Sequence, residues 1–258
     1  MPRATCTVRC YAELNDFLPR ERRQVTFEAR CDEGGSVKDL LEGLGIPHTE
    51  VDLILINGET AGFDARVAAG DRVAAYPVFE AFDIAGVTRV RPEPLREVKF
   101  VLDGHLGRLA AFLRLAGFDC LHWREAHDRE LAAAAAAERR MLLTRDRGLL
   151  KRREVTHGYA VRSTDPRQQL QEVFERFDLR RLARPFTRCM RCNGVLAAAS
   201  REQVADRVPP RSLALHSEFL ACEGCGRVYW RGSHVARLEA ILSGRGCLDI
   251  FQGPQRQK

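Results

Sequence analysis

Two CxxC pairs constrain the fold of this 258-residue chain more than any other feature. They are Cys189-Met190-Arg191-Cys192 and Cys222-Glu223-Gly224-Cys225, and each is followed within two residues by a glycine that permits a tight turn. The segment that contains them has few long apolar runs, and a domain this small usually needs a bound metal ion or disulfides to be stable. Four thiolates suit tetrahedral Zn²⁺ with no open coordination position. We therefore expect a zinc site that folds this segment and does not catalyse; redox disulfides or chance spacing are the alternatives.

The residues after the second pair suggest a surface for nucleic acid. Tyr229, Trp230 and Arg231 supply two rings for base stacking and a cation for phosphate contact. Aromatic packing over a thin zinc-bound core explains the two rings equally well. His234 is a further candidate ligand, although a surface or core histidine accounts for it more simply.

The composition favours an intracellular protein that binds nucleic acid. The formal net charge of +6 comes mainly from arginine, which prefers planar, bidentate contacts to phosphate. RNA or DNA is thus an expected partner, while a solvated basic surface explains any single arginine. No apolar stretch approaches the roughly 20 residues that span a bilayer, and no apolar signal core follows the first methionine. With an odd count of nine cysteines, this predicts a cytoplasmic protein with no membrane partner, whose remaining cysteines are ordinary thiols.

Residues 1–82 combine strand patterns with one helix. Strands are expected at 7–11, 25–27, 51–56 and after the Ala69-Gly70-Asp71 turn, with Ser36 as the N-cap of the helix. This order resembles the β-grasp, ubiquitin-like fold, and the Asn57-Gly58-Glu59 turn is similar to that of small sulfur carriers. Those carriers end in a free Gly-Gly, whereas this strand runs on through Phe79-Glu80-Ala81-Phe82. We therefore expect a domain that docks a protein or stabilises the chain, and not sulfur transfer.

A charged stretch with Pro92 and Pro94 marks a linker at residues 83–97. Residues 98–180 then alternate strands, expected at 99–102, 118–123, 141–144 and 159–161, with helices. Such alternation predicts an α/β domain in which a parallel sheet is flanked by helices. The first of these helices should end at Gly117, and its buried face should comprise Leu106, Leu109, Ala110, Leu113 and Ala116. The zinc segment occupies residues 184–247, and a disordered tail is expected at 248–258.

Two of the expected strands stop at an aspartate. Asp103 follows strand 99–102, and Asp146 follows Thr144 at the end of strand 141–144. Polar groups at the carboxyl ends of parallel strands converge in one crevice, which Asp128 at the start of a helix could also face. Carboxylate oxygens suit Mg²⁺ or Mn²⁺, which would offset the repulsion between like charges. In the simpler alternative Asp128 caps a helix, while Asp146 and Asp119 sit in turns.

Taken together, these motifs resemble one family. The stretch 100–119, the motif Leu143-Thr144-Arg145-Asp146-Arg147, the cysteine array and its closing Val228-Tyr229-Trp230-Arg231-Gly232-Ser233-His234 look like the Mut7-C family. That family is a PIN-like RNase domain fused to a zinc ribbon, preceded in some members by a ubiquitin-like domain. The resemblance covers nearly the whole chain.

The resemblance implies a metal-dependent ribonuclease. Asp103, Asp128 and Asp146 match the acidic PIN positions; Asp119 is a possible further acid, and Asp165 is the nearest candidate for a fourth. The arginines expected to contact RNA phosphates are Arg108, Arg114, Arg145 and Arg147. The expected reaction is hydrolysis of single-stranded RNA by metal-activated water, leaving a 5′-phosphate and a 3′-hydroxyl. The alternative is a non-catalytic RNA-binding or ribosome-associated adaptor whose acids only cap helices and turns.

Overall fold

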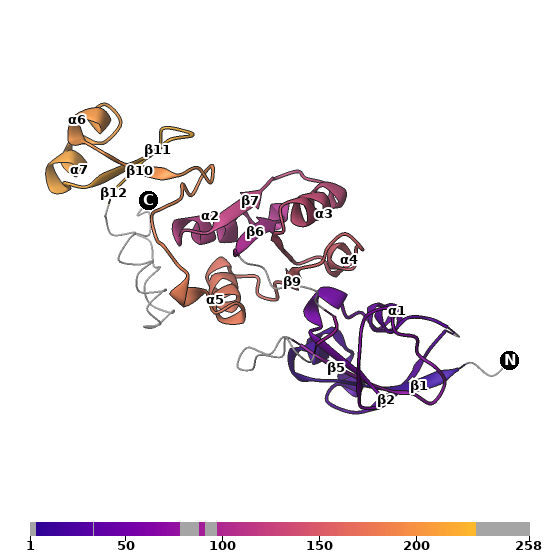
Figure 1. Ribbon diagram of the computed structural model, residues 1–258. Helices are drawn as coiled ribbons and strands as arrows, with labels where there is room; N and C mark the ends of the chain where they lie inside the picture. Colours follow the sequence, from indigo (N-terminus) through magenta and orange to yellow (C-terminus); the bar gives the residue numbers. More distant parts are fainter. Residues whose placement is uncertain (1–3, 33, 78–87, 91–96, 231–258) are drawn as a thin grey trace, which may run out of the picture. The chain divides into compact units, whose positions relative to one another are not determined.

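The N-terminal domain is a mixed five-stranded sheet with one α-helix, drawn in indigo to purple in Figure 1. In the computed structural model, which describes residues 4–32, 34–77, 88–90 and 97–230, the strands run in the order β2-β1-β5-β3-β4. β1 is parallel to β5, and the other neighbours are antiparallel. The elements are β1 (Thr5–Cys10), η1 (Ala12–Phe17), η2 (Arg20–Arg22), β2 (Phe27–Arg30), α1 (Val37–Gly43), η3 (His48–Glu50), β3 (Leu53–Ile56), β4 (Glu59–Ala61) and β5 (Arg72–Tyr76). This topology confirms the predicted β-grasp fold.

Local signals explain where these elements begin. Ser36 caps α1, as predicted: its hydroxyl accepts the Asp39 amide at 3.1 Å, and Asp39 accepts the Ser36 amide at 3.3 Å. Asn57 and Gly58 have φ of 55° and 95°, the left-handed pair that closes a tight hairpin between β3 and β4. The second strand starts at Phe27 and not at residue 25, because the two 3-10 helices extend the connection from β1.

The chain forms two compact units, Met1–His105 with Glu125–Val161 and Leu106–Arg124 with Arg162–Lys258. In the first unit, β6 (Lys99–Leu102), β8 (Met141–Thr144) and β9 (Gly158–Ala160) are parallel neighbours. Phe100, Leu102, Leu142 and Leu143 are fully buried, as expected of a parallel sheet covered on its faces. The alanine-rich α3 (Asp128–Ala137) packs against β6 and β8, and the single-turn α4 (Arg147–Leu150) follows β8. The predicted parallel α/β sheet is therefore confirmed.

In the second unit, α2 (Gly107–Leu115) follows η4 (Gly104–Leu106) and packs against α5 (Pro166–Arg176). The predicted apolar face of α2 is buried throughout. Gly117 ends the helix with φ of 99°, and a Cβ there would lie 2.0 Å from the Arg184 carbonyl oxygen. β7 (Asp119–His122) comes next in the sequence, and η5 (Leu179–Arg181) follows α5.

Residues 184–230, called here the four-cysteine domain, contain a three-stranded antiparallel sheet in the order β10-β11-β12. The strands are β10 (Leu196–Ala199), β11 (Phe219–Cys222) and β12 (Val228–Trp230), with α6 (Arg201–Val204) and α7 (Pro210–Leu215) between the first two. Its apolar core is small: Val204, Val208 and Phe219 form one buried group, and Leu196 packs with two of the cysteines. α6 and α7 are not predicted from the sequence, because helices this short show no hydrophobic periodicity.

No helix in the described part of the chain is long and apolar enough to cross a membrane. His234 and Arg231, the tail 248–258 and most of the predicted linker lie outside the described residues.

Candidate functional site

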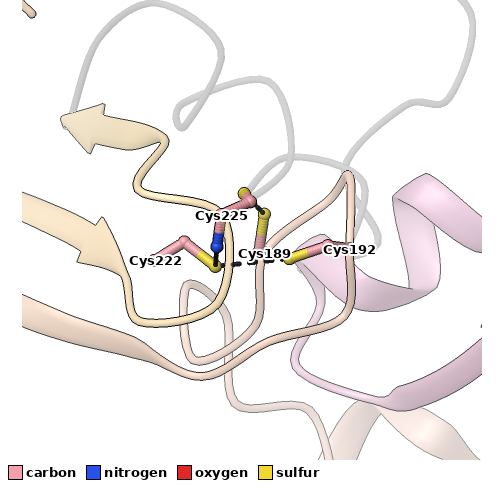
Figure 2. A group of neighbouring side chains, drawn as sticks. All are labelled: Cys189, Cys192, Cys222 and Cys225. Atoms are coloured by element: carbon pink, nitrogen blue, oxygen red, sulfur yellow. Dashed lines mark hydrogen bonds between the residues drawn. The ribbon is translucent and has the colours of Figure 1, made fainter.

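The four cysteines of the two CxxC pairs meet at one point, as Figure 2 shows. Their sulfur atoms all lie within 4.8 Å of one another, with Cys189 and Cys225 3.6 Å apart and Cys192 and Cys222 3.4 Å apart. In a tetrahedral site with Zn–S bonds of about 2.3 Å, the sulfurs are about 3.8 Å apart, so the spacing fits. The cluster can hold a structural metal ion such as zinc.

Two chain reversals bring these thiols together. The Asn193 amide bonds to the Cys189 carbonyl at 3.0 Å, and the Gly226 amide bonds to the Cys222 carbonyl at 2.9 Å. Asn193 and Gly226 have φ of 68° and 69°, so both reversals use left-handed residues directly after the second cysteine of each pair. This is the tight-turn geometry that the sequence predicts there.

Polar neighbours favour the thiolate form of Cys189. Burial by itself raises the pKa of this thiol, but the Tyr229 hydroxyl, 3.1 Å from Sγ, and the amides of Cys192 and Arg191 lower the pKa to about 6. A hydroxyl bonded to a thiolate ligand also orients that ligand. The Tyr229 hydroxyl therefore points at the cysteine cluster, as the packing alternative expects, and a role of its ring in base stacking stays a prediction.

Arg114 and Asp119 lie beside the first CxxC pair and not in an open surface. Arg114, 7% exposed, donates from its guanidinium to the Cys120 carbonyl at 2.8 and 2.9 Å and to the Met190 and Arg191 carbonyls at 3.2 and 3.1 Å. Asp119 accepts a hydrogen bond from the Asn193 side chain. The Arg114 side chain therefore points inward to these carbonyls, and the Asp119 carboxylate is held by Asn193. Both residues hold the first CxxC turn.

Asp103 and Asp146 end neighbouring parallel strands and are joined by one hydroxyl. Thr144 is fully buried and its hydroxyl donates to Asp103 Oδ2. The Thr144 hydroxyl oxygen in turn accepts the Asp146 amide at 2.9 Å. Asp103, 7% exposed, also accepts the amides of His105 at 2.9 Å and Arg145 at 3.2 Å. The exposed Asp146 caps α4 by accepting the Gly148 amide at 2.7 Å. Thr144 thus links the Asp103 carboxylate to the backbone of Asp146, while convergence of the two carboxylates stays a prediction.

Asp128 and Asp165 occupy helix starts. Asp128 is exposed and is the first residue of α3, while the preceding His127 is the N-cap and gives its amide to Glu130 at 2.8 Å. Asp165 caps α5 by accepting the amides of Arg167 and Gln168. Asp165 therefore acts as a helix N-cap, whereas Asp128 does not, because His127 takes that position in α3.

Asp103, Asp128 and Asp146 are not gathered as tightly as the cysteines. Among the described residues, only the four cysteines make a set of three or more potential ligands within 4.8 Å of one another. Mg²⁺ keeps several of its waters and binds through one or two carboxylates, so a site for it does not require all three acids in direct contact with the ion. Convergence of the three acids on one Mg²⁺ or Mn²⁺ ion therefore stays a prediction.

The remaining arginines predicted to contact RNA are all exposed. They are Arg108, Arg145 and Arg147, and the Arg147 guanidinium also lies over the Phe17 ring. Trp230 is half-buried and borders a groove of about 680 Å³ in the four-cysteine domain, which Phe186 and Phe219 also line. Sequence reasoning missed Phe186, since nothing local to it signals a groove.

The chain is a multidomain protein with three parts. It combines a ubiquitin-like domain, a parallel α/β sheet with acids at its strand ends, and a four-cysteine cluster that can hold a metal ion. Residues 98–242, more than half of the chain, match the family model described as the Mut7-C RNAse domain, and residues 3–83 match the model described as Mut7-C ubiquitin. The chain belongs to the Mut7-C family, whose matched domain is an RNase domain.

Individual proteins add little to this assignment. Two crystal structures of small archaeal modifier protein 1 from Haloferax volcanii match 30% of this chain and 99% of theirs. Their sequence identities are 25% and 24%, with TM-scores of 0.24 and 0.25. A search of curated proteins found no match.

Proposed function

We propose that this protein is a Mg²⁺- or Mn²⁺-dependent ribonuclease that hydrolyses single-stranded RNA at Asp103, Asp128 and Asp146. The observation that carries the proposal is the Asp103–Thr144–Asp146 linkage at the ends of β6 and β8, in a chain with a Mut7-C RNase domain. Carboxyl ends of parallel strands are where α/β folds bind ligands.

Each residue has a distinct part in this proposal. Asp103 is rigidly held by three donors and would be the fixed ligand, whereas the exposed Asp146 and Asp128 would complete the metal's surroundings. A bound divalent cation lowers the pKa of its water and stabilises charge on the scissile phosphate. The exposed Arg108 and Arg145 would neutralise neighbouring RNA phosphates, which makes binding salt-dependent.

The four-cysteine domain would add a second contact to RNA. Zinc at its cysteines would be structural, because four thiolates leave no open position. Trp230 and Phe186, both half-buried in the same groove, offer ring faces on which an unpaired base could stack. A cytoplasmic location suits this arrangement, since reduced thiolates persist in a reducing compartment.

Cleavage of labelled RNA tests the proposal. Wild type, D103N and D146N are compared on a single strand and on a duplex of the same sequence, with Mn²⁺ and with EDTA. We expect cleavage of the single strand by wild type with Mn²⁺ only, and a loss of at least about 100-fold in each variant, since removing a charge-stabilising group typically has effects of this size. Equal cleavage by all three proteins would identify a contaminant and refute the mechanism.

The rival function is a non-catalytic RNA-binding adaptor. The net charge of +6 supports RNA binding with or without cleavage. RNA bound equally by wild type and both variants, with no Mn²⁺-dependent cleavage by any of them, would favour the adaptor.

A further inference from the structure

Helix α4 is too short to hold its own position. It is a single turn, Arg147–Leu150, and isolated helices of that length do not form in water. Asp146 is its N-cap, so any displacement of α4 also displaces the Asp146 carboxylate. The residues that fix α4 therefore decide where this acid lies.

Both ends of α4 contact the β-grasp domain. At its start, the Arg147 guanidinium carbon lies 4.8 Å from the centre of the Phe17 ring, a cation–π contact with a ring that is 6% exposed. Just after its end, the Lys151 ammonium donates to the Glu42 carbonyl at 2.6 Å. Phe17 ends η1 and Glu42 is on α1, so two separate elements of that domain hold the turn.

The contact continues along the segment that leads from α4 into β9. His48 bonds through Nε2 to the Val155 carbonyl at 2.7 Å and through Nδ1 to the Glu42 carboxylate at 2.7 Å. Glu50, fully buried, accepts the Ala160 amide of β9 at 2.6 Å. These are buried, directional contacts, in which an unpaired group would be costly.

We propose that the ubiquitin-like domain positions Asp146 in cis, with Phe17 and Glu42 acting through α4. The partner of this domain is then the RNase domain of the same chain, and Phe17 and Glu42 are positioning residues that touch neither metal nor RNA. This inference rests on the proposed function of Asp146. It predicts that weakening the contacts between the β-grasp domain and α4 raises the Mn²⁺ concentration needed for RNA cleavage before it unfolds the protein.

Two readouts on the full-length chain test this. Hydrogen exchange is measured at amides 147–151, with the amides of β1 and β5 as an internal reference for global stability. The Mn²⁺ concentration that gives half-maximal RNA cleavage is the second readout. The variants are F17L, which removes the ring, F17Y, which keeps it, and F27L, a matched control whose ring lies 5.1 Å from the Arg22 guanidinium carbon in the same domain.

For F17L we expect exchange at 147–151 to accelerate and the half-maximal Mn²⁺ concentration to rise, each by about twofold to fivefold, in line with the loss of one cation–π contact made by an exposed arginine. F17Y should stay within about twofold of wild type by the same reasoning, and F27L should match wild type. K151A, compared with the exposed control R153A, tests the other end of α4 without altering the β-grasp core.

Faster exchange without any change in Mn²⁺ dependence would show a merely structural contact and overturn the positioning role, as would wild-type behaviour of both F17L and K151A. If D146N cleaves RNA as well as wild type, the proposed function fails instead. Exchange at 147–151 then still decides whether the β-grasp domain holds α4.

Discussion

The carboxylate of Asp119 accepts a 2.8 Å hydrogen bond from the side-chain amide of Asn193, 74 positions further along the chain. Arg188 adds an ion pair to the same carboxylate at 3.5 Å, and Asn193 Oδ1 accepts the Cys120 amide at 3.0 Å. The first CxxC turn is therefore fastened to β7. Folding of the metal site and of this part of the RNase domain should be coupled.

Replacing Arg114 should reveal this coupling. In R114M the carbonyls of Cys120, Met190 and Arg191 lose a shared buried donor, so the free energy of unfolding should fall by about 2–4 kcal/mol. Urea unfolding of the full chain measures the change. R108M, on the exposed side of the same helix, is the control, and an equal effect of the two variants would contradict the assignment.

Metal removal should unfold the four-cysteine domain selectively. We expect one zinc ion per chain by elemental analysis, and its loss in C192S, because three thiolates leave the tetrahedral site incomplete. Chelation should then accelerate hydrogen exchange in residues 184–230 before it affects β1 and β5. C6A should retain one zinc ion; zinc bound equally by C192S would place the metal elsewhere.

Buried thiols should make stability fall at alkaline pH. Burial raises the pKa of Cys10 to about 12, and burial together with Cys31 raises that of Cys6 to about 11, from about 8.5 in an unfolded chain. The folded state thus keeps protons that the unfolded state loses, so this contribution is complete below about pH 8.5 and declines as the pH rises through the folded values. Urea midpoints between pH 8 and 11 should fall more steeply for wild type than for C10A. Parallel curves would contradict this.

Thr144 should matter through its hydroxyl. T144V leaves the Asp146 amide without its partner and removes one of the two donors to Asp103 Oδ2, so we expect a loss of about 1–3 kcal/mol in unfolding free energy and at least about a tenfold loss of Mn²⁺-dependent cleavage. T144S keeps the hydroxyl and should retain most of both. Urea unfolding and the RNA cleavage assay measure these changes, and wild-type cleavage by T144V would remove Thr144 from the site.

The sequence by itself determined features that depend on short-range spacing. Ser36 and Asp39 sit three residues apart and form the expected capping box, and Gly117 ends α2 because only its left-handed backbone lets the helix close against Arg184. Both CxxC turns follow from their spacing in the same way. The run of apolar residues before Asp103 and Asp146 likewise sufficed to predict two parallel strands with an acid at the end of each.

Only the tertiary structure decided which charged side chains are available for chemistry. Arg114 and Arg145 look alike in the sequence, yet Arg114 is buried against backbone carbonyls of the cysteine turn and Arg145 is exposed. The sequence left Asp119 as either a further acid or a turn residue, and its carboxylate is engaged by Asn193. Arg147 contacts Phe17, 130 positions earlier in the chain. Such pairings join segments far apart in the chain, and their free energy depends on burial and on the partner's orientation, which no local pattern encodes.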